Sequence, residues 1–360
     1  MNKFKSATQK DIAISLGLSV STVSRVLADE YGIGDETRKA VIAYAKKIGY
    51  FPNPAAKKLK GSRSYSIGVL VPELSSSYFS QIINGIESIA HEKGYRIIIS
   101  QTHNNSEREY AALRQLTAQP IDGILMSLSS GAKDLSHLAF LSRQDIRIVY
   151  FDRVPREPDV NKVVVSNHLA AYQATQHLIK MGCRRIAHLT SSPNLLITEE
   201  RIAGYQEALA DHKIQFDPGY LAYCTFGGMA YKEVENAIDH LLNLEEKPTA
   251  IFSASDELTL TCLRVFHQKG IDISRDLAFV GFTNHNEATL FNPPITAVSQ
   301  PAFDMGEKAV GLLIRQIESK HAPIPAETIV LATTFNGSMR DGERNDLDRP
   351  IDENFRNKLS

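Results

Sequence analysis

The sequence predicts a small all-α N-terminal domain followed by a larger α/β body of two lobes. The chain has 360 residues, and at roughly 150 residues per domain it is long enough for two or three domains. Over the first 50 residues, apolar side chains recur at helical spacing and a glycine turn separates two short helices. From Ser66 onward, strand and helix patterns alternate, as in parallel sheets wrapped by helices.

The composition is that of a globular protein, with 43% hydrophobic and 22% charged residues. No apolar run approaches the roughly 18 residues of a membrane span, and the N-terminal residues lack the apolar stretch of a secretory signal. Three widely spaced cysteines fit neither a disulfide framework nor a zinc site. We therefore expect a protein of the reducing cytoplasm, with no metal, no cofactor and no membrane partner.

The charge is distributed unevenly along the chain. Residues 1–65 contain 12 Lys and Arg against 5 Asp and Glu, whereas the remainder contains 28 against 36. A basic N-terminal part on an acidic body suggests that the N-terminal part meets a polyanion. The alternative is a solvated basic face with no partner.

The N-terminal domain is expected to contain three short helices. Thr8 and Asp11 resemble a capping box at the start of the first helix, which ends at Gly17. Ser19 can cap a second helix over residues 20–28. A third helix starts near Asp35, ends at Gly49 and buries Val41, Ala45 and Ile48. Helix, tight turn and helix is the spacing of a helix-turn-helix.

The domain boundaries follow from these patterns. Residues 1–50 form the head, 51–65 a hinge or linker, 66–340 the two-lobed body and 341–360 a charged tail. In the hinge, Ala55 to Lys60 could form two helical turns, which are marginal in water by themselves. The segment is therefore either a flexible linker or one that orders on a partner.

The body contains too many strands for one mononucleotide-type unit, so we expect two lobes, with the last strand and helix returning to the first lobe. Ser106 and Glu109 resemble a capping box. The expected strands span residues 67–71, 96–99, 123–126, 147–151, 163–165, 185–189, 221–223, 250–253, 277–281 and 297–298. The expected helices span residues 79–92, 106–118, 170–181, 202–211, 229–242, 258–269 and 303–317.

The second helix has two distinct faces. Val23, Val26 and Leu27 form an apolar face, and the opposite stripe carries Val20, Ser21, Ser24 and Arg25. Small side chains let a helix approach base edges, a valine methyl can meet a thymine methyl, and arginine can bond guanine through two donors. Although most such stripes are ordinary solvent-exposed faces, the turn spacing and the basic head favour a DNA-reading helix here.

The head begins with Thr8-Gln9-Lys10-Asp11-Ile12-Ala13 and continues through the run from Leu16 to Leu27. On these residues rests a close resemblance to the head of the lactose/galactose-repressor (LacI/GalR) family of bacterial transcription regulators. It extends in order along nearly the whole chain, through Thr37-Arg38, Gly49–Asn53, Ala56, Leu59, Phe151-Asp152-Arg153, Gly182–His188, Arg201–Tyr205, Asp276–Phe282, Gln300-Pro301 and Met305-Gly306. The body then resembles a type I periplasmic-binding-protein-like effector domain.

The resemblance implies a repressor-type regulator associated with the bacterial nucleoid, which binds a near-palindromic double-stranded operator as a homodimer. Val20, Ser21 and Arg25 would read bases in the major groove. Leu59 would wedge into the minor groove beside the small Ala56, with Lys60 supplying charge. The implied phosphate and positioning contacts, which fix register, are Thr8, Ser19, Thr22, Ser24, Thr37 and Asn53.

The resemblance also implies that a sugar-like effector binds between the two lobes. Arg201 matches the ligand-gripping arginine of the family, and Tyr78 or Phe79 could stack on a sugar ring. The implied effector-binding residues are Ser75, Tyr78, Phe79, Asp152, Arg153, Asn167, Arg201, Phe226, Asp256 and Thr283, with Thr225 an alternative to Phe226. Several follow strand ends, where open α/β sheets bind ligands.

The chain departs from the family pattern at three positions. Ala28 stands where asparagine is frequent, and Gly34 where a serine precedes the third helix; both affect single backbone contacts. Thr283 stands where the family usually has aspartate, a strong acceptor for sugar hydroxyls. The ligand class therefore does not carry over from other members.

The sequence also bears on two other function classes. An enzyme is disfavoured because the sequence contains no G-x-G-x-x-G after the first strand, no P-loop, no G-x-S-x-G and no H-E-x-x-H. A free-standing solute-binding protein would fit the body, but the attached head and the missing signal segment argue against it.

Overall fold

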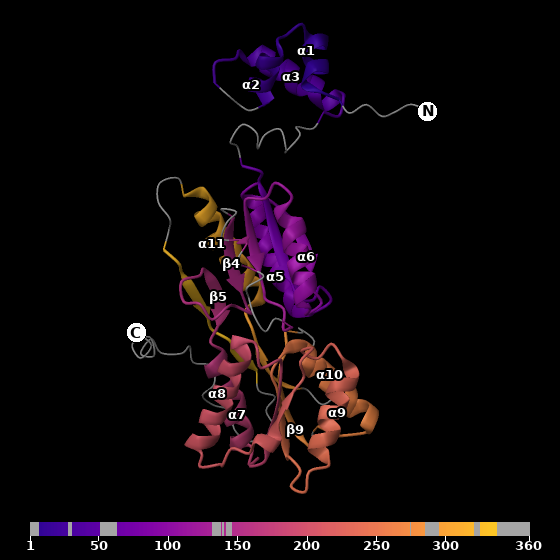
Figure 1. The fold of residues 1–360 in the computed structure, drawn as a ribbon, viewed down its shortest axis with the longest axis vertical. Helices are drawn as coiled ribbons and strands as arrows, with labels where there is room; N and C mark the ends of the chain where they lie inside the picture. Colours follow the sequence, from indigo (N-terminus) through magenta and orange to yellow (C-terminus); the bar gives the residue numbers. More distant parts are fainter. Residues whose placement is uncertain are drawn as a thin grey trace. The chain divides into compact units, whose positions relative to one another are not determined.

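The computed structural model describes residues 7–27, 31–50, 63–131, 138, 140–141, 146–273, 275–284, 295–319 and 325–336. The chain divides into two compact units, Met1–Ser64 and Tyr65–Ser360. Figure 1 shows the helices of the first unit and the two sheets of the second. Among the helices of the described part, none combines the length and the apolar character that a membrane span requires.

The first unit is a three-helix domain made of α1 (Gln9–Leu16), α2 (Val20–Leu27) and α3 (Asp35–Lys47). Thr8 and Asp11 form the expected capping box, and the Ser19 hydroxyl accepts from the backbone N–H of Thr22 at 3.0 Å. Gly17 ends α1 in the left-handed region, at φ 65°, which glycine adopts without a steric penalty. The helices enclose a small core of Ile12, Ala13, Val23, Val26, Val41 and Ala45.

The first lobe of the body is a six-stranded parallel sheet in the order β11-β5-β4-β3-β1-β2. Helices α5 (Ser77–Glu92) and α11 (Ala302–Glu318) share a core with one face of this sheet, and α6 (Ser106–Thr117) packs on the other. The strands are β1 (Ser66–Val71), β2 (Arg96–Gln101), β3 (Gly123–Met126), β4 (Arg147–Phe151), β5 (Lys162–Val165) and β11 (Thr328–Leu331).

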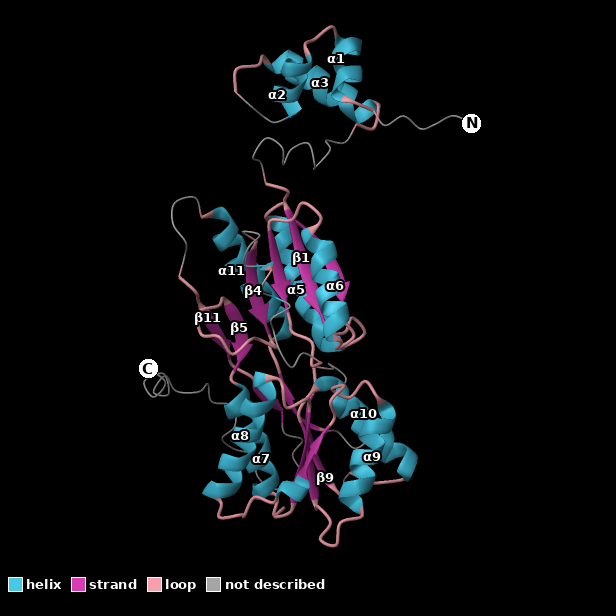
Figure 2. Cartoon of the chain, in the orientation of Figure 1, coloured by secondary structure: helices cyan, strands magenta, loops and turns pink. Residues whose placement is uncertain are grey.

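The second lobe repeats this layering with the order β12-β10-β9-β8-β6-β7, in which only β12 runs antiparallel to its neighbour. Figure 2 shows its strands between flanking helices. The helices are α7 (Asn167–Lys180), α8 (Leu196–Asp211), α9 (Tyr231–Leu242) and α10 (Asp256–Lys269). The strands are β6 (Ile186–Thr190), β7 (Leu221–Tyr223), β8 (Ala250–Ser253), β9 (Ala278–Phe282), β10 (Thr296–Ser299) and β12 (Thr334–Asn336).

Along the described elements, the chain crosses between the lobes three times: from β5 to α7, from β10 to α11 and from β11 to β12. Helix α11 therefore belongs to the first lobe, as the sequence suggested, and packs along α5. At this crossing the two helices approach closely. A Cβ on Gly306 would lie 2.1 Å from the Ile82 carbonyl oxygen, and one on Gly85 would lie 2.1 Å from the Phe303 carbonyl oxygen.

Some local predictions were wrong. The N-cap of α6 is Asn105, whose side chain accepts from the Arg108 N–H, and not Ser106. Glu109 does not complete a capping box, because its buried carboxylate accepts from the Ser129 N–H at 2.6 Å. Helix α8 begins at Leu196, six residues before the expected start at 202; the polar run from Thr198 to Arg201 interrupts the apolar pattern between Ile197 and Ile202. Strands β11 and β12 were not predicted.

Candidate functional site

The outer face of α2 is the candidate DNA-reading surface. Val23 and Val26 are buried, whereas Val20, Ser21 and Arg25 are exposed, with 45% of Val20 accessible. The two-faced helix predicted from the sequence is therefore present. Thr8, Ser19 and Thr37, which were expected to contact phosphates, are exposed or half-buried on the same domain, as are Thr22 and Ser24.

Several polar side chains of this surface also hold the helix starts. The Thr8 hydroxyl bonds to Asp11 Oδ2 at 2.7 Å, and the Ser19 hydroxyl lies 2.7 Å from that of Ser21 and 2.8 Å from that of Thr22. These hydroxyls are thereby oriented before any DNA arrives. The remaining expected DNA contacts, Asn53, Ala56, Leu59 and Lys60, lie outside the described residues.

The candidate effector site is a cleft at the carboxyl ends of the strands, where the two lobes of the body face each other. Among the described residues, its polar lining includes four carboxylates and two guanidinium groups. Six of the ten expected effector residues line it: Tyr78, Phe79, Asp152, Arg153, Arg201 and Asp256.

Asp152 is the first residue after β4 and adopts a left-handed backbone conformation, with φ 58°. Such a conformation is unfavourable for a residue other than glycine, and it persists where the surrounding structure imposes it. The Tyr78 hydroxyl donates to Asp152 Oδ1 at 2.9 Å, which leaves Oδ2 facing the Arg153 Nε at 3.8 Å. Burial raises the pKa of Asp152 above its usual value, against the opposing effect of Arg153 and Arg201.

Arg153 is held on two sides. Its Nη1 donates to Asn104 Oδ1, and its guanidinium lies over the Phe79 ring, 5.9 Å from the centroid. Asn104 in turn places its Nδ2 2.9 Å from the sulfur of Met229, on the opposite lobe. Arg153 therefore has a fixed orientation in the cleft.

Arg201, on α8, is 4% exposed and has a complete set of neighbours. Its Nε and Nη2 donate to Asn167 Oδ1 at 3.1 and 2.9 Å, Nη2 also donates to Gln300 Oε1 at 3.0 Å, and Nη1 donates to the Ala254 carbonyl. Its guanidinium stacks on Phe282, 3.9 Å from the ring centroid. Burial lowers the pKa of Arg201 to about 10, so the group remains charged at neutral pH.

Asp256, the first residue of α10, is satisfied by donors from both lobes. Its Oδ1 accepts from the Thr283 hydroxyl at 2.9 Å and from the Asn284 N–H at 3.0 Å, and its Oδ2 accepts from Ser76 at 3.3 Å. Thr283, at the position where the family pattern has aspartate, thus donates to a carboxylate instead of supplying one.

Four expected effector residues do not line the cleft. Asn167 and Thr283 are buried behind it and bond to Arg201 and Asp256, respectively. Ser75 is exposed, and its N–H donates to Glu73; Phe226 is 55% exposed. Among the lining residues that the sequence did not single out are Glu73, Ser76, Asn104, Met229, Glu257 and Gln300.

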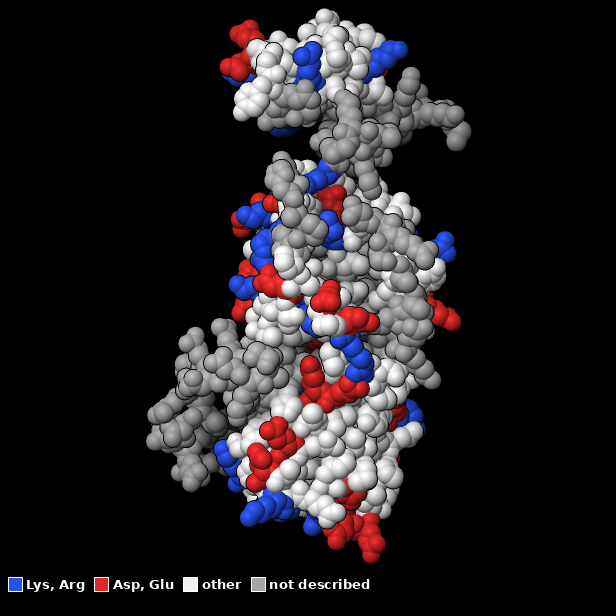
Figure 3. All heavy atoms as spheres, turned by 60° about the vertical axis from the view of Figure 1, so that its left-hand side comes forward, with Lys and Arg blue, Asp and Glu red and all other residues white. Residues whose placement is uncertain are grey.

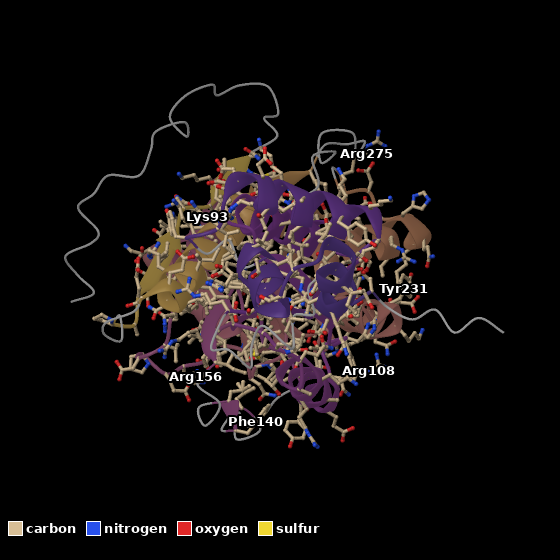
Figure 4. The ribbon with its side chains drawn as sticks, turned by 90° about the horizontal axis from the view of Figure 1, so that it is seen from above. Lys93, Arg108, Phe140, Arg156, Tyr231 and Arg275 are labelled. Carbon is tan, nitrogen blue, oxygen red and sulfur yellow. The ribbon has the colours of Figure 1, made fainter. Side chains whose placement is uncertain are left out.

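Direct contacts join the lobes around the cleft. Besides Ser76 and Asp256, the Gln81 Nε2 donates to the Asn284 carbonyl at 2.9 Å, and the Ser130 hydroxyl donates to the Thr225 carbonyl at 3.0 Å. Arg156 and Glu199 form an exposed two-point ion pair between the lobes. Arg156 is labelled at the margin of the molecule in Figure 4.

A helix-turn-helix domain joined to a two-lobed α/β body with a cleft between the lobes defines the class of DNA-binding regulators with a periplasmic-binding-protein-like core. The comparisons agree with this class. Residues 8–53 match the family "Bacterial regulatory proteins, lacI family", and residues 64–334 match "Periplasmic binding proteins and sugar binding domain of LacI family". The chain belongs to the LacI family of bacterial transcription regulators.

Individual relatives cover nearly the whole chain. The transcriptional regulator RegA of Clostridium saccharobutylicum is 30% identical over 88% of this chain and 94% of its own length. The transcriptional repressor CytR of Escherichia coli K12 is 30% identical over 93% of this chain and 96% of its own. The structure of a transcriptional regulator CelR–cellobiose complex matches with a TM-score of 0.67 at 28% identity, covering 92% of this chain and 98% of that one.

Proposed function

We propose that this protein is a homodimeric transcription repressor whose operator affinity is set by a sugar-type effector in the cleft. The proposal assigns base reading to Val20, Ser21 and Arg25, and phosphate contacts to the hydroxyls around them. The observation that carries it is the separation of α2 into a buried face and an exposed face in a chain of the LacI family. One helix buries too little surface for specific affinity, so two heads bind a near-palindromic site together.

The cleft controls the affinity of the protein for its operator. Its groups come from both lobes, with Asp152 and Arg153 on the first and Arg201 and Asp256 on the second. A ligand that contacts both lobes changes the equilibrium between lobe arrangements, and with it the spacing of the two hinge segments of a dimer. Likeness to a regulator solved with cellobiose supports a sugar-type effector. The proposal assigns no catalytic step to the cleft and places the protein on the bacterial chromosome.

The test has two arms. Selection from a random duplex library with the full-length protein is expected to return a near-palindromic operator; equal binding to all duplexes would overturn the assignment of the head. A thermal-shift screen of sugars, repeated with and without operator, is expected to find a compound that changes operator affinity. A ligand that binds the body without changing operator affinity would overturn the coupling.

A further inference from the structure

We infer that the cleft selects an uncharged polyhydroxyl effector and rejects its phosphorylated or carboxylated forms. The inference rests on the proposed effector site and adds the charge class of the ligand. The described lining of the cleft carries an excess of two negative charges. Its acidic residues are Glu73, Asp152, Asp256 and Glu257, and its basic residues are Arg153 and Arg201.

Arg201 is not available as an anion clamp. Phosphate and carboxylate are recognised by guanidinium groups that can offer two parallel donors. Arg201 donates to Asn167, Gln300 and Ala254 and stacks on Phe282, so each of its three nitrogens is already bonded to the protein. Breaking these bonds to seat an anion would leave buried acceptors without partners, which is unfavourable.

Arg153 is also bonded to the protein, and it lies beside a carboxylate. Its Nη1 is bonded to Asn104, its Nε faces Asp152 Oδ2 at 3.8 Å, and its plane lies over Phe79. The two N–H groups of Nη2 and the second N–H of Nη1 make no hydrogen bond among the described contacts. A phosphate bound there would come close to the carboxylate of Asp152, whereas a hydroxyl or ring oxygen carries no charge for that carboxylate to repel.

The remaining lining suits a neutral ring with hydroxyl groups. Among the described contacts Asp152 Oδ2 accepts no hydrogen bond and lies 3.8 Å from Arg153 Nε, and a carboxylate oxygen accepts strongly from a ligand hydroxyl. Phe79, Ile197 and Met229 supply the apolar contacts that the face of a sugar ring needs. Acidic and basic side chains are mixed on the face of the body drawn in Figure 3. The selection by charge is therefore assigned to the lining of the cleft and not to that outer face.

The test measures affinities of the full-length protein for matched pairs by calorimetry. The probes are glucose, galactose, fructose, ribose, trehalose and cellobiose, each beside its monophosphate. In every pair with a binding member, the neutral sugar is expected to bind at least tenfold more tightly. A phosphorylated member that binds equally or more tightly would overturn the inference and leave the sugar-type effector standing. Absence of binding by all members of both kinds would overturn the sugar-type effector itself, and the inference with it.

A variant tests the electrostatic cause. Glu257→Gln removes one negative charge of the lining while keeping the shape of the side chain, and is expected to reduce the neutral-to-phosphate affinity ratio at least threefold. Glu245→Gln, at an exposed position that is not part of the described lining, is the matched control and should leave the ratio unchanged. Equal ratios in wild type and Glu257→Gln would overturn the electrostatic explanation.

Discussion

The hydroxyl of Ser76 and the carboxylate of Asp256 meet across the cleft, 3.3 Å apart, at the starts of two helices that belong to different lobes. Asp256 receives its two other donors from its own lobe, through Thr283 and Asn284. Ser76 is thus the partner through which the first lobe contacts this buried charge.

Ser76→Ala is expected to lower the free energy of unfolding of the body by about 1 kcal/mol, the usual contribution of one hydrogen bond. Urea unfolding, followed by circular dichroism, measures the change. Ser80→Ala is the matched control, because the exposed Ser80 hydroxyl bonds only to the Ser77 carbonyl within the same helix. Equal losses in the two variants would show that the contact between the lobes adds nothing.

Gly306→Ala is expected to destabilise the first lobe by about 1–3 kcal/mol, in the range of overpacked cores. A methyl group at this position would lie 2.1 Å from the Ile82 carbonyl oxygen, so α5 and α11 would have to move apart. Gly311→Ala in the same helix has no atom within 4 Å of the new methyl and should stabilise by about 0.5–1 kcal/mol through helix propensity. Opposite signs in denaturant unfolding would confirm the close helix crossing.

The stability of the body should depend on pH through His188. Burial lowers the pKa of His188 to about 3, whereas a histidine in an unfolded chain titrates near pH 6.5. Between these values the unfolded chain binds a proton that the folded chain does not, so stability falls as pH drops from about 6.5 towards 3.

The variant His188→Phe keeps a ring between Phe252 and Tyr205, on which His188 stacks, and removes the titration. Denaturant unfolding between pH 7 and 5 should therefore give a shallower dependence than in the wild type. An unaltered slope in His188→Phe would contradict the assignment.

Arg25→Ala is expected to relax base preference at one operator position by about 1–3 kcal/mol, because a side chain that bonds a base edge carries sequence information. Binding to a library of operator variants measures the preference. Lys47→Ala, on the exposed side of α3, should at most weaken binding uniformly across the library. An unchanged preference in Arg25→Ala would remove this residue from the base-reading surface.

Leu59→Ala should reduce specific binding by about tenfold or more while changing non-specific binding little, because only a specific complex repays the opening of a base step. Competition titrations with operator and random duplex separate the two affinities. An equal loss of both would count against the minor-groove wedge.

The body fold was largely predictable because its buried strands and amphipathic helices alternate with clear periods. The runs around Val69 and Ile251 are mostly apolar and are buried along their whole length, as expected for strands covered on both faces. Strand β11 escaped prediction because it is short and lies at a sheet edge with alternating exposure. Its pairing with β5 depends on a partner about 160 residues away in sequence, which no local pattern reveals.

The site was predictable only where a strand end or the family resemblance marked a residue. Asp152 and Arg201 were found in this way, and both line the cleft. Asn104 and Gln300 were missed because their importance comes from contacts with Arg153 and Arg201, which lie far away along the chain. Asn167, which is predicted to bind the ligand, is bonded through its Oδ1 to Arg201 in the structure and does not line the cleft.

The three crossings between the lobes also determine how the protein can be synthesised. Helix α11 covers Ile82 and Ile86 of α5 yet is made more than 200 residues later. On the ribosome, the first lobe must therefore wait with an apolar face uncovered while most of the second lobe emerges and folds. A chain released before Ala302 would display that face permanently, which makes early termination products of this gene natural substrates for chaperones and proteases.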